Sequence, residues 1–272
     1  MRVTAAVVAA LVLLYAQVAI GLVRQWSTDP TASQGWLLAG AALFLLLQRR
    51  TALRQIPVRP GSTGIALAAI AMVIYLAGSI AGDLFVQRVS LPLAVAGAVH
   101  ALAGPAHFRS LFAPIALITL AIPLPAIVVT YVTMPLQLVS SQIAADMLQA
   151  SNIHVVQQGN LLVLDAMTLE VAEACSGLQS LLSLASVAAV GAALLPISTW
   201  GRVLMFVAVL PIAIIGNGLR VAATGVLSTW VGQAAVEGVV HQATGYVAFV
   251  AMCAGMFALL WIGRFSPART AS

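Results

Sequence analysis

Eight long apolar runs dominate this chain of 272 residues and constrain its fold more than any other feature. Hydrophobic residues make up 62% of the chain and charged residues only 7%, whereas soluble domains carry about 25% charged residues. Inside a lipid bilayer only helices and closed barrels satisfy the backbone, and long runs without strict alternation favour helices. We therefore predict an all-α polytopic membrane protein, with spans at about residues 3–24, 35–48, 62–82, 90–105, 111–131, 177–196, 202–224 and 240–262.

The longest stretch between predicted spans covers about residues 132–176, which we interpret as a cap on a single integral membrane domain, 1–272. Its first part, 134–150, has the pattern of an amphipathic helix that lies on the membrane surface. Its second part has β-branched and apolar residues around Gln158-Gly159-Asn160, followed by an apolar/acidic alternation at 169–173. This pattern predicts a β-hairpin or three short strands.

The charged residues predict the orientation of the chain. All 12 basic residues are arginines, scattered singly or in short groups between apolar runs, which favours membrane orientation over nucleic-acid binding. With Arg2 inside, most arginines fall in cytoplasmic segments, with exceptions at Arg24, Arg88 and Arg220. All seven acidic residues then fall outside. We expect both termini to be cytoplasmic.

Cys175 stands where the predicted cap ends and the sixth span begins. A thiol at a helix N-terminus is biased toward the reactive thiolate, and backbone N–H groups at the same helix start can face a developing oxyanion. The alternative is a small packed residue, since free cysteines are often only that. Cys253 lies mid-span among apolar residues, so we interpret it as packing.

Two further polar residues lie near the outer ends of later spans. Arg220 follows Asn217 by three residues, on the same helical face, and an arginine inside a span tends to face the protein interior or a watery cavity. Its alternative is an interfacial arginine that extends to the headgroups. His241 opens the eighth span and can exchange a proton near neutral pH, although such a histidine is often only interfacial.

Together, Cys175, Arg220 and His241 fall at the same predicted depth on three successive spans. A cysteine nucleophile needs a base, and a tetrahedral intermediate needs positive charge or hydrogen-bond donors. The chain has no serine elbow, no metal-binding histidine pair and no phosphate-binding glycine loop. We therefore expect a thiol-based site with neither metal nor cofactor.

These motifs resemble those of the exosortases and archaeosortases. Glu173-Ala174-Cys175-Ser176-Gly177, Asn217-Gly218-Leu219-Arg220 and His241 occur in the order in which that family has Ala-Cys-Ser/Asn-Gly, Asn-x-x-Arg and a histidine at the last helix. Near the N-terminus, Gln34 stands where the family commonly has a histidine. The resemblance implies Cys175 as nucleophile, Arg220 for the oxyanion or substrate orientation and His241 as general acid/base, with support from Asn217, Glu173 and Ser176.

The resemblance also implies a function and a location. The expected protein is a transmembrane cysteine peptidase or transpeptidase of the bacterial inner membrane, with its site on the periplasmic side. Its expected partners are membrane lipid, an unknown acceptor and exported proteins that end in a Pro-Glu-Pro-type motif, a transmembrane helix and a basic tail. Two alternatives remain: a transporter or channel that uses Arg220 as an anion site, and a non-catalytic scaffold for exopolysaccharide assembly.

Overall fold

The computed structural model describes residues 2–165, 167–171, 177–236 and 238–262. The chain divides into two compact units, Met1–Pro125 and Ala126–Ser272, which we call the N-terminal unit and the C-terminal unit. Each unit has its own packed helices, and they are described separately below. The prediction of a single domain over 1–272 stays a prediction.

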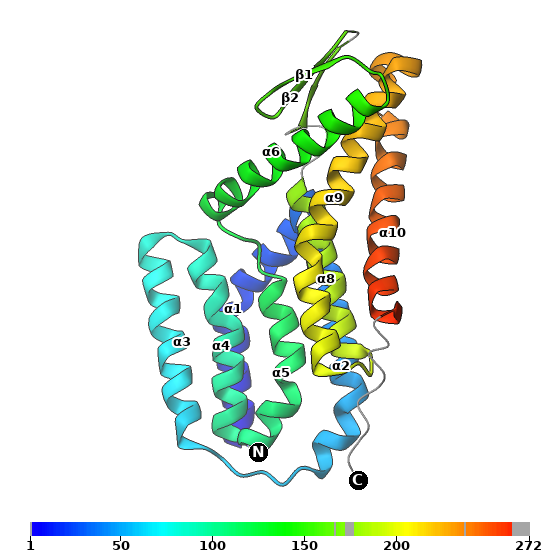
Figure 1. Ribbon diagram of the computed structural model, residues 1–272. Helices are drawn as coiled ribbons and strands as arrows, with labels where there is room; N and C mark the ends of the chain where they lie inside the picture. The colour runs from blue at the N-terminus through cyan, green and yellow to red at the C-terminus, as the bar shows by residue number, and fades with distance from the viewer. Residues whose placement is uncertain (1, 166, 172–176, 237, 263–272) are drawn as a thin grey trace. The chain divides into compact units, whose positions relative to one another are not determined.

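The N-terminal unit is built from helices that run back and forth with short connections (Figure 1). Asp29 and Asp83 cap η1 and α4 with their carboxylates, and Gly82 ends α3 with a positive φ of 68°. The elements are α1 (Arg2–Thr28), η1 (Pro30–Ala32), α2 (Gln34–Gln55), α3 (Ser62–Ala81), α4 (Leu84–Leu102) and α5 (Pro105–Leu120).

Helices α3 and α4 form a closely packed antiparallel pair because glycines remove side chains from their interface. A Cβ atom at Gly97 would lie 2.6 Å from the backbone nitrogen of Ala68, and one at Gly78 would lie 2.8 Å from that of Gln87. Small residues let two helix backbones approach closely, which is how helices gain packing energy inside lipid.

A polar chain of contacts joins α1 and α4 near the end of α1. Arg88 Nη1 donates to Gln25 Oε1 at 2.6 Å, and Gln25 Nε2 donates to Asp29 Oδ2 at 3.3 Å. Trp26 Nε1 donates to the carbonyl oxygen of Ala121 at 2.9 Å. Burial opposes ionisation of Asp29, but hydrogen bonds from Thr31 and Gln25 outweigh it and lower the pKa of its carboxyl.

The C-terminal unit combines helices with a small antiparallel sheet of order β1-β2-β3 (Figure 1). Helix α6 lies obliquely across α9, and α8, α9 and α10 pack together. The elements are α6 (Ala126–Ala150), β1 (Val155–Gln158), β2 (Leu161–Leu164), β3 (Thr168–Glu170), α8 (Gly177–Leu194), α9 (Thr199–Val231), η2 (Gly232–Ala235) and α10 (Gly238–Ile262).

The predicted strands are confirmed as a three-stranded sheet. Val155 pairs with Leu164 and Gln158 with Leu161, so the connection is the two-residue turn Gly159-Asn160, where Gly159 has φ of 65°. Alternate residues of the sheet then point to one face and pack on α6 and α9. The core that they share contains Val155, Leu162, Leu164 and Leu169 from the sheet, Val171 after it, Ala144, Ala145 and Leu148 from α6, and Val221 and Ala222 from α9.

A second core holds α8, α9 and α10 together. Leu184 and Ala188 of α8 meet Met205 of α9 and Met256 of α10, all of them fully or almost fully buried. Gly216 of α9 leaves room for Met252 of α10. These contacts hold the three helices that carry the polar residues singled out from the sequence.

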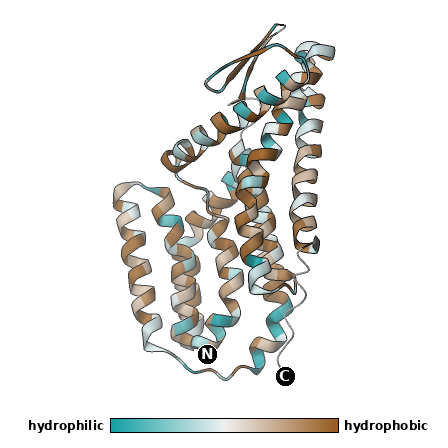
Figure 2. Cartoon of the chain, in the orientation of Figure 1, coloured by the Kyte–Doolittle hydropathy of each residue, from teal (hydrophilic) through white to brown (hydrophobic). Residues whose placement is uncertain are grey.

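The described residues contain eight helical segments long and apolar enough to cross a membrane, which confirms the predicted fold class. Hydrophobic positions, coloured brown, recur along these helices (Figure 2). Large examples include Leu13, 78% exposed, and Ile80, 88% exposed, which a lipid environment would cover. The eight segments lie at Thr4–Thr28, Pro30–Gln55, Ser62–Ala81, Leu84–Leu102, Ala126–Ala150, Gly177–Leu194, Thr199–Ala235 and Gly238–Trp261.

The predicted bounds of the fifth span, 111–131, and of the surface helix, 134–150, are wrong, because the helices run over Pro105–Leu120 and Ala126–Ala150. The chain breaks at residues 121–125 because Pro123 and Pro125 lack a backbone N–H and disfavour helical conformation in the residue before them. Helix α5 has 16 residues and is therefore about 24 Å long, short of a hydrocarbon core of about 30 Å. Helix α6 then runs unbroken through Pro135, and Gln137, Ser140 and Ser141 are buried rather than facing water.

The close α3–α4 packing generates a stability prediction. Gly97→Ala places a methyl group against the backbone of Ala68, so we expect a loss of about 1–3 kcal/mol from overpacking. Gly40→Ala in α2 is the matched control, because a Cβ there meets nothing within 4 Å and the change should stabilise the helix slightly. Thermal unfolding of the detergent-solubilised protein measures both, and equal midpoints would contradict the packing argument.

Candidate active site

Helix α9 carries Asn217 and Arg220 one turn apart. The helix runs for 33 residues, and a spacing of three residues puts both side chains on neighbouring parts of the same face. Asn217 is completely buried, whereas Arg220 is half-buried. An arginine inside a membrane-spanning helix is costly unless protein groups or a polar cavity surround it.

Asn217 packs against the first described residue of α8. A Cβ atom at Gly177 would lie 3.1 Å from Asn217 Nδ2, so only a glycine fits this contact without displacing the amide. Among the described residues, neither the nitrogen nor the oxygen of the Asn217 amide has a hydrogen-bond partner. A buried polar group without a partner costs about 1–3 kcal/mol, which a purely structural residue would not retain without reason.

Arg220 and His241 form a hydrogen bond that joins α9 to α10, and we call these residues the Arg–His pair. Arg220 Nη2 lies 3.1 Å from His241 Nε2. Because a guanidinium only donates, Nε2 must accept, so the imidazole in this arrangement is neutral and carries its proton on Nδ1. The bond therefore sets both the position and the tautomer of the histidine.

Gly245 makes room for the guanidinium. It follows His241 by one helical turn, so it lies on the same face of α10. A Cβ atom at Gly245 would lie 2.9 Å from Arg220 Nη2 and 3.1 Å from Cζ. The guanidinium thus occupies the space that any other residue at 245 would fill, and Gly245 permits the short Arg–His contact.

A polar pocket of about 410 Å³ lies beside the Arg–His pair, among α8, α9 and α10. Its wall combines one cation with neutral hydrogen-bonding groups and aromatic rings. Its polar lining includes Ser180 and Ser183 of α8, Arg220 of α9, and His241, Gln242 and Tyr246 of α10.

An apolar groove of about 790 Å³ lies between α9 and α10 and shares a wall with the polar pocket. Arg220 lines both cavities, whereas the rest of the groove is mainly aliphatic, as at Ile215, Leu219 and Val247. The guanidinium therefore stands at the boundary between a polar and an apolar cavity, where it can meet a ligand that has both kinds of surface.

The structure brings together three of the residues singled out from the sequence, namely Asn217, Arg220 and His241. Cys175, Glu173 and Ser176 lie outside the described residues. The described ranges contain no group of three or more His, Cys, Asp and Glu side chains that could hold a metal ion.

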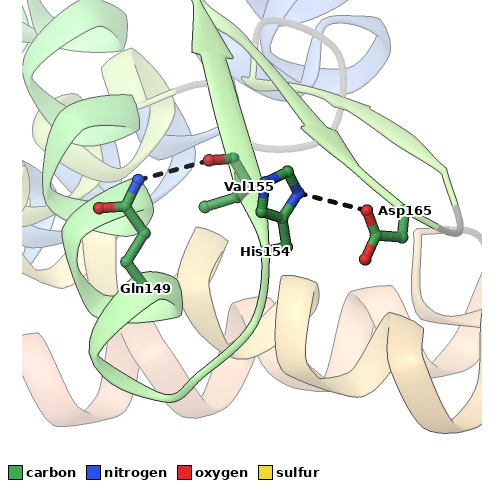
Figure 3. A network of polar contacts seen from close by, with 4 residues as sticks. All are labelled: Gln149, His154, Val155 and Asp165. Atoms are coloured by element: carbon green, nitrogen blue, oxygen red, sulfur yellow. Dashed lines mark hydrogen bonds and ion pairs between the residues drawn. The ribbon is translucent and has the colours of Figure 1, made fainter.

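The remaining cysteine and histidines lie elsewhere. Cys253 packs beside the apolar α8–α9–α10 core, as its surroundings in the sequence predict. His154 immediately precedes β1, and its Nδ1 lies 3.3 Å from Asp165 Oδ1, with both side chains largely exposed (Figure 3). His100 and His107 belong to the N-terminal unit.

Two features of the site were missed from the sequence. The spacing of four residues between His241 and Gly245 indicates that both lie on one face of the helix. That spacing alone does not reveal the role of Gly245, because a glycine in an apolar helix has many other uses. Ser180 and Ser183 have the spacing of one helical face, but their meeting with α10 depends on tertiary packing.

The fit of Arg220 beside Gly245 generates a second stability prediction, tested by a double-mutant cycle. Gly245→Ala should lower the unfolding midpoint, because the methyl group displaces the Arg220 guanidinium from its hydrogen bond with His241. A hydrogen bond to a charged group contributes about 1.5–3 kcal/mol, more than the roughly 0.5–1 kcal/mol that alanine adds to helix stability. Gly255→Ala, on the same helix with nothing within 4 Å of a Cβ, should raise it slightly.

In an Arg220→Ala background the clash at position 245 is absent. There Gly245→Ala should behave like Gly255→Ala, and the difference between the two backgrounds measures the contact. Thermal unfolding of the four proteins checks this. Equal effects of Gly245→Ala in both backgrounds would contradict the assigned contact.

Comparison with known proteins completes the description of the site. Residues 26–258 match the family model described as transmembrane exosortase (Exosortase_EpsH), which spans both units and includes Asn217, Arg220 and His241. No match to the chain is found among curated proteins or among solved structures. Because the matched range covers most of the chain, this multi-pass membrane protein belongs to the transmembrane exosortase family.

Proposed function

We propose that this chain is a membrane-embedded cysteine peptidase or transpeptidase in which Cys175 is the nucleophile and the Arg–His pair assists it. The observation that carries the proposal is the 3.1 Å contact between Arg220 and His241, one turn from the buried amide of Asn217. That amide packs against Gly177, and Gly177 follows Cys175 by two residues. Covalent geometry limits the Cα–Cα distance across two residues to about 7 Å.

In the proposed reaction, His241 first takes the thiol proton of Cys175. The thiolate then attacks the scissile carbonyl carbon, a C–S bond forms, and the carbonyl electrons move to the oxygen. His241 gives the proton to the leaving amine as the C–N bond breaks, which leaves a thioester. Water or an acceptor nucleophile then cleaves the thioester and regenerates the thiol.

The tautomer of His241 suggests how proton transfer and oxyanion stabilisation are coupled. Nε2 accepts the hydrogen bond from Arg220 while the imidazole is neutral. Once Nε2 carries the thiol proton, it can no longer accept, and two like charges repel each other. The guanidinium then redirects a donor toward the oxyanion as that charge develops. Asn217 Nδ2 supplies a second donor, and Glu173 and Ser176 support the same site.

The proposed substrates are exported proteins that end in a sorting motif, a transmembrane helix and a basic tail, and the proposed acceptor is a nucleophile of unidentified class. We place the site on the periplasmic side of a bacterial inner membrane, with both chain termini cytoplasmic. The charge distribution supports this orientation. Arg49, Arg54 and Arg109 lie at one end of the N-terminal unit and Asp29 and Asp83 at the other, as the positive-inside rule expects.

Substitution of Cys175 tests the proposed chemistry. The probe is an exported reporter protein that ends in a Pro-Glu-Pro motif, a membrane-spanning helix and an arginine-rich tail. We expect Cys175→Ala and Cys175→Ser to abolish conversion of precursor to product, because no other group supplies the acyl intermediate. Electrophoretic separation of the two forms measures conversion.

Cys253→Ala is the matched control and should leave conversion within about twofold of the native rate, since Cys253 packs away from the Arg–His pair. Native-level conversion by Cys175→Ala would contradict the nucleophile. A transporter or a non-catalytic scaffold instead predicts that the native chain does not convert the probe.

Asn217 generates a prediction with two opposite readouts. Asn217→Leu removes a buried amide that lacks a hydrogen-bond partner among the described residues, so we expect the unfolding midpoint to rise, by about 1–3 kcal/mol of stability. The same change should lower conversion of the probe at least tenfold, about 1.4 kcal/mol of transition-state stabilisation. A rise in stability with unchanged conversion would show that the amide takes no part in catalysis.

A further inference from the structure

The polar pocket contains hydroxyl and amide groups that the proposed chemistry does not use. Ser180 and Ser183 line it from α8, and Gln242 and Tyr246 line it from α10. Its volume of about 410 Å³ falls in the range of small ligand pockets, about 300–1,000 Å³. The pocket extends from the Arg–His pair along the helices, so whatever occupies it lies directly beside the proposed nucleophilic chemistry.

The two serine hydroxyls differ from the hydroxyls of Ser186 in α8 and Thr244 in α10. Ser186 Oγ donates to the carbonyl of Leu182 at 2.8 Å, and Thr244 Oγ1 donates to that of His241 at 2.8 Å, so each is satisfied by its own helix. Within the described ranges, neither the Ser180 hydroxyl nor the Ser183 hydroxyl has a hydrogen-bond partner. Both hydroxyls are therefore available to a ligand in the pocket.

These groups lie inside a membrane-spanning segment. Ser183 is the seventh residue of α8, so it lies about 9 Å further along the helix axis than Gly177. Little water reaches the hydrocarbon region of a bilayer, and a polar group there without a hydrogen-bond partner costs roughly several kcal/mol. A polar pocket there has a clear use only if it receives a polar ligand.

Peptide cleavage next to a transmembrane helix creates such a ligand. The Pro-Glu-Pro motif of the proposed substrate cannot continue that helix, because each proline lacks a backbone N–H and disfavours helical conformation in the residue before it, so the segment beside the scissile bond is extended. An extended segment exposes N–H and C=O groups that lipid cannot satisfy. The enzyme therefore has to supply replacement partners close to the nucleophile.

We propose that the polar pocket binds the backbone of an extended substrate segment beside the scissile bond. Ser180, Ser183 and Gln242 supply the hydrogen bonds that an extended segment cannot make within itself. Hydroxyl and amide side chains both donate and accept, which matches the N–H and C=O groups of a peptide backbone. The inference rests on the proposed function and adds to it the site where the peptide segment is held.

A crosslinking experiment tests whether the bound segment is extended. Cys175→Ala and Cys253→Ala remove both native thiols, and Ser183→Cys places a single new one in the pocket. The probe is the reporter described above, with one cysteine moved through eight consecutive positions around its motif. An extended segment presents alternate residues to the same side, so disulfide yield should peak at every second position.

Ser186→Cys in the same background is the matched control, since Ser186 lies on the same helix but does not line the pocket. It should give at most about a tenth of the Ser183→Cys yield. A repeat of three to four positions would mean that the segment enters as a helix, and equal yields from both cysteines would mean that the pocket does not hold it. Either result overturns the inference.

Conversion of the probe supplies an independent arm. Ser180→Ala and Ser183→Ala should each slow conversion about two- to tenfold, as expected for the loss of one hydrogen bond, whereas Ser186→Ala should stay within twofold. Unchanged conversion by a variant that carries both Ser180→Ala and Ser183→Ala overturns only the inference about the pocket. Unchanged conversion by Cys175→Ala overturns the proposed function.

Discussion

The bilayer requires every backbone polar group to find its partner inside the protein, and the rest of this structure depends on that requirement. Helices meet it within single segments, which is why the described chain is almost entirely helical apart from one small sheet. Inside lipid the hydrophobic effect does not drive helices together, so they associate through close packing. Glycines such as Gly97 and Gly78 mark where their backbones approach.

Glycines also make room for two polar groups of the site. Gly245 on α10 leaves a hollow that the Arg220 guanidinium fills, and the guanidinium in turn holds His241 Nε2. Gly177 lets the Asn217 amide lie against the start of α8. Arg220 and Asn217 are thus each matched to a glycine on a neighbouring helix, which leaves room for their polar side chains.

The fold class, the three-stranded sheet and the candidate residues Asn217, Arg220 and His241 follow from patterns in the sequence. Apolar runs predict spans because their lengths match the bilayer, and a Gly-Asn turn between β-branched runs predicts paired strands. The error at 111–131 came from treating hydrophobicity as continuous across Pro123 and Pro125. Those prolines end α5 and leave α6 to start at Ala126, so Ser140 and Gln137 become interior residues instead of the polar face of a surface helix.

By itself, the sequence determined that the chain spans a membrane as several helices, because no soluble fold can hide so much apolar surface. It also determined that Asn217 and Arg220 share a helical face, because that depends only on their spacing. Tertiary structure alone decided that Arg220 reaches across to His241 and that Ser180 and Ser183 join them around one pocket. Those contacts come from the way α8, α9 and α10 pack together, which depends on side-chain volumes from three distant segments rather than on any local pattern.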